Sequence, residues 1–153
     1  MIISLIGCGK SEETMKDEIY ELIIMQDFDE ARSKVAEYFG DDRSEAVSWL
    51  MLISEMEGEL YSDKLVIQDG WTWKVDGNYT YINGRVKNNG DKPIRYFKIT
   101  AQYLNEYDNV LDTDYTNSTE TVRPGDSKEF EIMHRDNDEY KKTRIFVEEV
   151  NIE

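Results

Sequence analysis

Residues 12–58 repeat their apolar positions with a spacing of about 3.6, which is the period of an α-helix. Three such runs follow one another, the second preceded by Asp27 and the third by Asp42. Each aspartate is followed three residues later by a glutamate, a pattern typical of a helix start. The positions that share a face in the three runs are Met15, Ile19, Leu22, Ile23 and Gln26; Phe28, Ala31, Val35, Tyr38 and Phe39; and Ala46, Trp49, Leu50, Ile53 and Met56. We expect a three-helix module.

Two glycines mark helix ends in this segment. Gly40 follows the second run directly, where the left-handed backbone conformation that glycine tolerates is common. The third run is expected to end at Gly58. After Gly58 the helical period stops, so the join between two domains is predicted there.

Short alternating runs replace the helical period in residues 59–153. The clearest is 97–103, where Phe97, Ile99, Ala101 and Tyr103 alternate with polar residues, as in a half-buried strand. About seven such runs are separated by turn pairs such as Asp-Gly, Asn-Gly and Pro-Gly. The runs begin near residues 65, 71, 79, 97, 110, 130 and 145. This spacing predicts an antiparallel immunoglobulin-like β-sandwich, and the whole chain is therefore expected to be α+β.

Three segments of this region resemble the FxLYD domain family. They are GRVKNNGDKPI at 84–94, ITAQYLN at 99–105 and VRPGDSKEF at 122–130. The motif that names the family is not present verbatim, and Tyr103-Leu104-Asn105 stands near its expected place. The resemblance covers residues 62–150. It implies an extracytoplasmic bacterial sandwich domain that serves as a binding or structural module, without catalytic residues to carry over.

The amino-terminal segment ends in Leu5-Ile6-Gly7-Cys8 and resembles the lipobox of bacterial lipoproteins. The resemblance implies that the Cys8 thiol takes a diacylglycerol and that cleavage after Gly7 makes Cys8 the new amino terminus. A secretory signal also has a basic segment and about 7–15 apolar residues, and neither precedes Cys8, so we expect the natural start to lie upstream. The alternative is an ordinary buried cysteine. We interpret residues 1–11 as lipobox remnant and tether, ahead of domains at 12–58 and 59–153.

Charge and composition exclude several classes of protein. The chain has 33 acidic and 18 basic residues and a net charge of −15, which would repel a polyphosphate backbone, so nucleic acid is not an expected partner. One cysteine forms no internal disulfide, and one histidine builds no multi-histidine metal centre. The expected partners are the membrane, through the lipid anchor, and an unknown protein or envelope ligand.

The sequence shows no recognisable set of catalytic residues. His134 is the single imidazole, and we expect it to be a surface or strand-end residue. Ser118 and Ser127 lie outside any G-x-S-x-G motif, and a nucleophile would need a base and an orienting group. We therefore predict a non-enzymatic protein. A small hydrolase that uses paired carboxylates is a remaining alternative.

Two acidic clusters offer oxygen ligands for calcium. They comprise Asp112 and Asp114, and Asp136, Asp138 and Glu139. Calcium takes six to eight oxygens, but neither cluster has the register of an EF-hand loop. We expect solvated loops and keep a calcium-dependent adhesion or carbohydrate-binding module as an alternative.

Aromatic residues are numerous in the predicted sandwich. They include Trp71, Trp73, Tyr79, Tyr81, Tyr103, Tyr107 and Tyr115. We expect most of them in the core or in cross-strand pairs. Several on one exposed face would stack on sugars or on a peptide.

Overall fold

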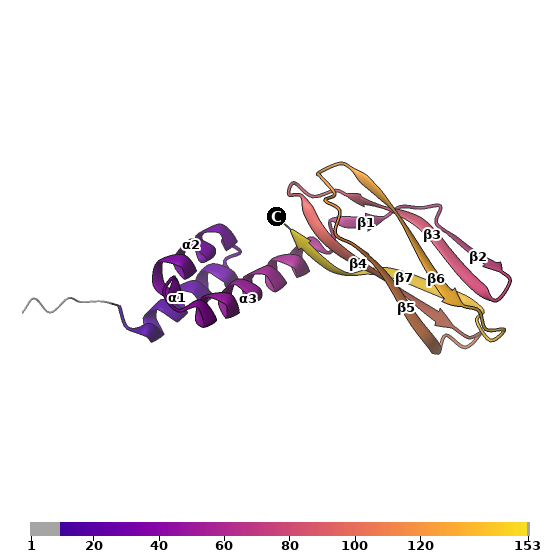
Figure 1. The fold of residues 1–153 in the computed structure, drawn as a ribbon, viewed down its shortest axis with the longest axis horizontal. Helices are drawn as coiled ribbons and strands as arrows, with labels where there is room; N and C mark the ends of the chain where they lie inside the picture. The colour runs from indigo at the N-terminus through magenta and orange to yellow at the C-terminus, as the bar shows by residue number, and fades with distance from the viewer. Residues whose placement is uncertain (1–9, 153) are drawn as a thin grey trace, which may run out of the picture. The chain divides into compact units, whose positions relative to one another are not determined.

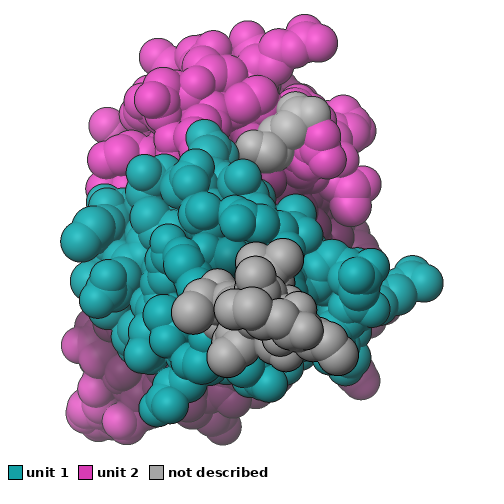
Figure 2. Space-filling view, turned by 90° about the vertical axis from the view of Figure 1, so that its left-hand side faces the viewer, with its two compact units in different colours: residues 1–56 teal, residues 57–153 magenta. Residues whose placement is uncertain are grey.

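The computed structural model describes residues 10–152. The chain divides into two compact units, Met1–Met56 and Glu57–Glu153, which Figure 2 colours separately. Within the described residues, none of the helices combines the length and the apolar character needed to cross a membrane.

The first unit is helical, and local side-chain contacts set where its helices begin. They are α1 Glu12–Ile24, α2 Phe28–Phe39 and α3 Arg43–Tyr61 (Figure 1). The Asp27 carboxylate accepts from the Glu30 N–H at 3.3 Å, and Asp42 accepts from the N–H groups of Ser44 and Glu45 at 3.1 Å. Both predicted helix starts are confirmed, because each carboxylate satisfies N–H groups that a first turn leaves free.

The apolar faces of this unit meet in one core. Its buried members are Ile19, Ile23, Phe28, Ala31, Val35, Phe39 and Ile53. Three predicted details are wrong. Gly40 was expected to be left-handed, but its backbone is right-handed, with φ −57°. Gln26 was expected on the apolar face of the first helix, but it lies beyond the end of α1 in the left-handed conformation, with φ 62°. The third helix continues through Gly58 to Tyr61, because one interior glycine costs a helix only about 1 kcal/mol and does not by itself end it.

The second unit contains two antiparallel sheets, which confirms the predicted α+β class and the sandwich (Figure 1). In one sheet β3 pairs with β6 along one edge and with β1 and β2 along the other. The other sheet has the order β5-β4-β7. The strands are β1 Leu65–Ile67, β2 Thr72–Asp76, β3 Tyr79–Asn88, β4 Ile94–Leu104, β5 Val110–Ser118, β6 Ser127–Arg135 and β7 Lys142–Ile152. The finer immunoglobulin-like assignment stays a prediction.

Side chains from both sheets fill a common core. The alternation expected at 97–103 is present, with Phe97, Ile99, Ala101 and Tyr103 all buried on one face of β4. Ile82 and Val86 of β3 face them from the other sheet. Because strand side chains alternate between faces, this period-two pattern was enough to identify the buried side.

The turns at residues 88–91 and 124–125 have the hydrogen bonds and backbone conformation that their residue types predict. The buried Asn88 amide donates to the carbonyls of Lys92 and Val122 at 2.9 Å, and its oxygen accepts from the Gly90 N–H. Gly125, after Pro124, has φ +83°, as the third residue of a type II turn requires. These contacts confirm the predicted turns.

Candidate functional site

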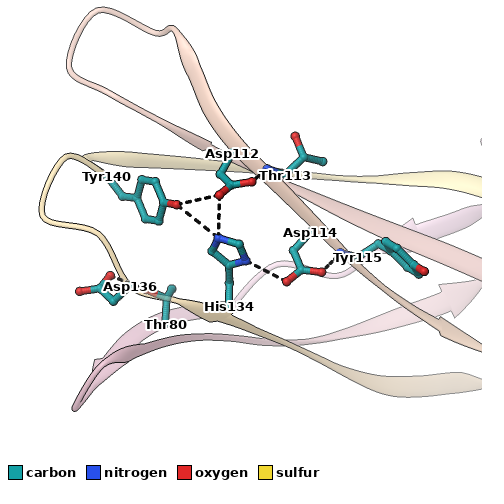
Figure 3. A network of polar contacts seen from close by, with 8 residues as sticks. All are labelled: Thr80, Asp112, Thr113, Asp114, Tyr115, His134, Asp136 and Tyr140. Carbon is teal, nitrogen blue, oxygen red and sulfur yellow. Dashed lines mark hydrogen bonds and ion pairs between the residues drawn. The ribbon is translucent and has the colours of Figure 1, made fainter.

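A polar network lies where β5 of one sheet runs close to β6 of the other (Figure 3). Asp112 and Asp114 are two residues apart on β5, so their side chains point to the same side of the strand. His134 of β6 lies between them. Its Nδ1 is 2.8 Å from Asp114 Oδ2, and its Nε2 is 3.3 Å from Asp112 Oδ2. One imidazole thus connects two carboxylates of the opposite sheet.

Two tyrosines complete the network. The Tyr140 hydroxyl lies 3.2 Å from both Asp112 Oδ2 and His134 Nε2 (Figure 3). The Tyr103 ring stacks on the His134 ring with centroids 4.6 Å apart, and on the Tyr140 ring at 5.0 Å. Stacking and hydrogen bonding together hold the imidazole in one orientation.

The electrostatics of the network follow from hydrogen bonding and burial. The Thr113 N–H donates to Asp112 at 2.8 Å and, with help from His134 and Tyr140, holds the pKa of the Asp112 carboxyl below its usual range. Burial raises the pKa of Tyr140, and the nearby Asp112 carboxylate raises it further. Burial and the charge of Asp114 also raise the pKa of Tyr103. Asp112 is therefore held as an anion beside phenols that stay neutral.

The Tyr103 hydroxyl is a second polar feature of this region. It is fully buried and has no hydrogen-bond partner among the described residues. The carboxylates of Asp114 and Asp112 both act on its pKa, which places the hydroxyl within electrostatic range of the network. A buried hydroxyl without a partner costs free energy, so this position is a local weakness of the core.

A pocket of about 630 Å³ opens beside the network. Its lining residues are almost all polar: Gly77, Asn78, Asp112, His134, Arg135, Asp136, Asn137, Asp138 and Tyr140. They come from the β2–β3 turn, from β5, and from the end of β6 with the loop that follows. The volume falls within the range of small-molecule sites, whereas most such sites are more apolar.

The five predicted calcium ligands are placed in different environments. Asp112 and Asp114 are engaged with His134, and Asp136 accepts from the Thr80 hydroxyl at 2.6 Å. Asp112, Asp136 and Asp138 line the pocket. Between residues 10 and 152, no group of three or more histidine, cysteine, aspartate or glutamate side chains is arranged to hold a metal ion. The calcium site stays a prediction.

His134 occupies the expected strand-end position, but it is not the exposed surface residue that the sequence also suggested. His134 is the penultimate residue of β6, but only 15% of its side chain is exposed. The sequence carries no local signal for this arrangement, because its partners Asp112 and Asp114 lie about twenty residues away. Cys8, the predicted lipidation site, lies outside the described residues.

The aromatic residues do not gather in one environment. Tyr103 is buried, and Trp71 and Trp73 are partly buried against the sandwich core. Tyr79, Tyr107 and Tyr115 are exposed. The predicted core position therefore holds for Tyr103 and in part for the two tryptophans. Tyr79 and Tyr115 are exposed but lie opposite Arg135 and Thr100 on the neighbouring strands, as the alternative of cross-strand pairing predicted, whereas Tyr107 is in neither environment.

Comparisons with known proteins identify no family. No family model matches the chain, so the FxLYD resemblance stays a prediction. No curated protein matches it either.

Several solved structures are distantly similar. IrmA from Escherichia coli shares 17% identity over 58% of this chain and 78% of its own, with a TM-score of 0.42. A DUF1425 family member from Shewanella sp. pv-4 has 8% sequence identity with this chain. The match covers 57% of this chain and 90% of that protein, with a TM-score of 0.41. The Salmonella enterica trimeric lipoprotein SadB has 10% sequence identity with this chain. The match covers 89% of this chain and 88% of SadB, with a TM-score of 0.41. Likenesses of this size carry no argument about function.

Proposed function

We propose that this chain is a non-enzymatic, lipid-anchored extracytoplasmic bacterial protein that presents its β-sandwich for binding a protein or an envelope ligand. The binding role rests on the pocket beside His134. Its walls combine side chains from both sheets, and hydrogen bonds fix His134, Asp112 and Tyr140 in position. A preorganised polar pocket lowers the entropy cost of binding.

The chemistry of His134 supports binding over catalysis. A histidine that serves as general base needs one nitrogen free to reach a nucleophile or a water. Here each nitrogen already has an aspartate partner. Within the described part of the chain, the hydrogen-bond partners of His134 are Asp112, Asp114 and Tyr140, and neither Ser118 nor Ser127, the two serines considered as nucleophiles, is among them.

The anchor rests on Leu5-Ile6-Gly7-Cys8, because lipid transfer needs a thiol directly after a small residue. A diacylglycerol-bearing cysteine holds a protein at a bilayer without a membrane-spanning helix. The strong acidity of the chain suits a surface that stays in solution rather than lying on anionic lipid.

Metabolic labelling tests the anchor directly. Cells that express the gene from its own chromosomal locus are fed an alkyne analogue of palmitate, and we expect the protein to be labelled and to fractionate with the membrane. The matched control is Cys8→Ser, which removes one sulfur atom and should abolish both results. An unlabelled wild-type protein would refute the anchor.

Calcium-dependent adhesion is the alternative that shares the same pocket. It requires Asp136 and Asp138, both of which line the pocket, to turn toward a common ion. Calorimetry with calcium on the wild type and on the Asp136→Ala Asp138→Ala variant separates the two functions. Heat in the wild type alone would favour calcium binding, and no heat in either would eliminate it.

A further inference from the structure

The side of α1 that faces solvent carries large apolar side chains. Ile19 and Ile23 of this helix are buried in the helical core. Tyr20 and Ile24 each lie one position further along, so their side chains are turned about 100° away from those two residues. The exposed fractions are 55% for Tyr20, 63% for Ile24 and 73% for Met25, the residue that follows the helix. Three apolar neighbours with this exposure form a patch, whereas apolar residues scattered singly over a surface are ordinary.

Carboxylates occupy the rest of this face. Positions 13, 17, 20 and 24 follow one another at intervals of four, three and four residues, the spacing with which one helix meets another in a coiled coil. The first two of them are Glu13 and Asp17, and Glu21 lies one turn beyond Asp17. All three are exposed, and between residues 10 and 152 none of their carboxylates has a hydrogen bond or an ion pair. This face is therefore both apolar and negatively charged.

The basic residues that flank this face along the chain are paired with other carboxylates. Lys10 Nζ lies 2.5 Å from Glu18. Lys16, which borders the face, lies 2.8 Å from Glu12 and 2.9 Å from Glu45. Since these ammonium groups already have carboxylate partners, the three unpaired carboxylates of the face are left for a cationic partner.

We propose that this face of α1 docks a basic amphipathic helix of another protein. Apolar side chains of the partner pack on Tyr20 and Ile24, and its lysines or arginines pair with the carboxylates of Glu13, Asp17 and Glu21. The inference goes beyond the pocket proposed above. It concerns the helical unit, and neither binding surface depends on the other.

Charge and exposure favour this partner and this helix. A second copy of the chain would bring the same carboxylates against one another, and an anionic lipid surface would be repelled as well. Among the described residues, α2 exposes no large apolar side chain. Helix α3 exposes Val47, Leu50 and Met51, but Arg43 lies one turn before Val47, so the charge there is not of a single sign. Of the three helices, α1 is thus the one whose exposed apolar residues stand beside unpaired charges of one sign.

Titration of the full chain with a helical peptide built only from leucine and lysine tests the proposal. The protein carries carbon-13 in its methionine methyl groups, and a proton–carbon correlation spectrum records each methyl signal. We expect the peptide to shift the Met25 signal and to leave the exposed Met51 of α3 and Met133 of β6 unchanged. Binding should weaken as the salt concentration rises. A peptide with the same leucines and with glutamate in place of every lysine is the control and should shift no signal.

Charge reversal on the face supplies the second measurement. The double variant Asp17→Lys Glu21→Lys is expected to weaken binding of the leucine–lysine peptide about tenfold, because two attractive charge pairs become repulsive. The matched control is Asp41→Lys Glu55→Lys, which makes the same change in net charge at two exposed positions outside this face and should bind like the wild type. Circular dichroism verifies that both variants are folded.

Several outcomes would overturn the proposal. They are an unmoved Met25 signal, an equal shift with the glutamate peptide, and an equal loss of affinity in the two double variants. A Met25 shift produced by phosphatidylcholine vesicles, or by raising the protein concentration alone, and not by the leucine–lysine peptide would identify lipid or a second copy as the occupant instead. None of these outcomes affects the lipid-labelling result.

Discussion

His134 links the two sheets of the sandwich through side-chain contacts, because β5 and β6 belong to different sheets and are not joined by backbone hydrogen bonds. It joins β6 of one sheet to β5 of the other through Asp112 and Asp114, and its ring covers that of Tyr103. An imidazole between two carboxylates provides hydrogen bonds and relieves the repulsion between two like charges. At the scale of single residues, this pairing holds one open edge of the sandwich together.

Replacement of His134 should therefore destabilise the sandwich. We expect His134→Ala to lower the free energy of unfolding by about 1–3 kcal/mol, because Asp112 and Asp114 lose a shared partner and Tyr103 loses a stacked ring. Urea unfolding followed by tryptophan fluorescence measures the change. Glu131→Ala, at an exposed position of the same strand, is the control and should change stability by less than about 0.5 kcal/mol. An equal effect of both substitutions would contradict this role.

The Asp112 carboxyl should make the free energy of unfolding depend on pH. Folding lowers the pKa of this carboxyl, so the folded state binds fewer protons there than the unfolded chain. The stabilisation is complete above the unfolded pKa of about 4 and is lost as the pH falls toward the lower folded value. Urea unfolding at several pH values should show a shallower loss of stability below about pH 4 in Asp112→Asn than in the wild type. Identical slopes would argue against the shift.

The helix α3 illustrates how one element serves two environments. In its first part, Ile53 is buried in the helical core, and Ala46 and Trp49 pack against that core. Residues from Glu57 onward belong to the sandwich unit. Glu57 is buried there and pairs with Lys92 at 2.9 Å. The hydrophobic period alone predicted an end at Gly58, because a glycine in a helix and a glycine after a helix look alike in sequence.

Gly58 tests this arrangement of α3. Alanine normally stabilises a helix interior by about 1 kcal/mol relative to glycine. A Cβ at position 58, however, would collide with the main-chain carbonyl oxygen of Val150 in β7. We therefore expect Gly58→Ala to lower the melting temperature, whereas Ser54→Ala, at an exposed position of the same helix, should leave it equal or slightly higher. A higher melting temperature for Gly58→Ala would show that helix propensity outweighs the contact.

At the scale of the whole molecule, residues 10–152 form two separate hydrophobic cores. The helical core and the sandwich core share no buried residue. Each core loses its own packing energy when one of its members is truncated, typically about 2–5 kcal/mol for isoleucine to alanine. The two units should therefore respond to core substitutions independently.

A pair of matched substitutions tests this independence. Ile19→Ala removes a fully buried side chain from the helical unit, and Ile82→Ala removes one from the sandwich. We expect Ile19→Ala to reduce helical circular dichroism at elevated temperature while the NMR signals of β3 and β4 persist. Ile82→Ala should weaken the strand signals first. Loss of both sets of signals together in the Ile19→Ala protein would mean that the two units unfold as one.

The sequence by itself determined the features that depend on near neighbours. Helix starts at Asp27 and Asp42 follow from side chains that reach N–H groups two or three residues on. The buried face of β4 follows from strict alternation, and the turn at Gly125 follows from the conformational freedom of glycine. Each of these is decided within a few residues, so pattern and propensity were sufficient.

Only the tertiary structure decided which distant side chains meet. His134 finds its partners about twenty residues away because β5 and β6 happen to border the same open edge, and Gly84 lies beneath Phe130 because register places them opposite one another. Register likewise leaves Gly84 and Arg85 of β3 between the segments paired with β1 and with β2. Register and sheet packing are set by the summed burial of many side chains, which no local pattern encodes.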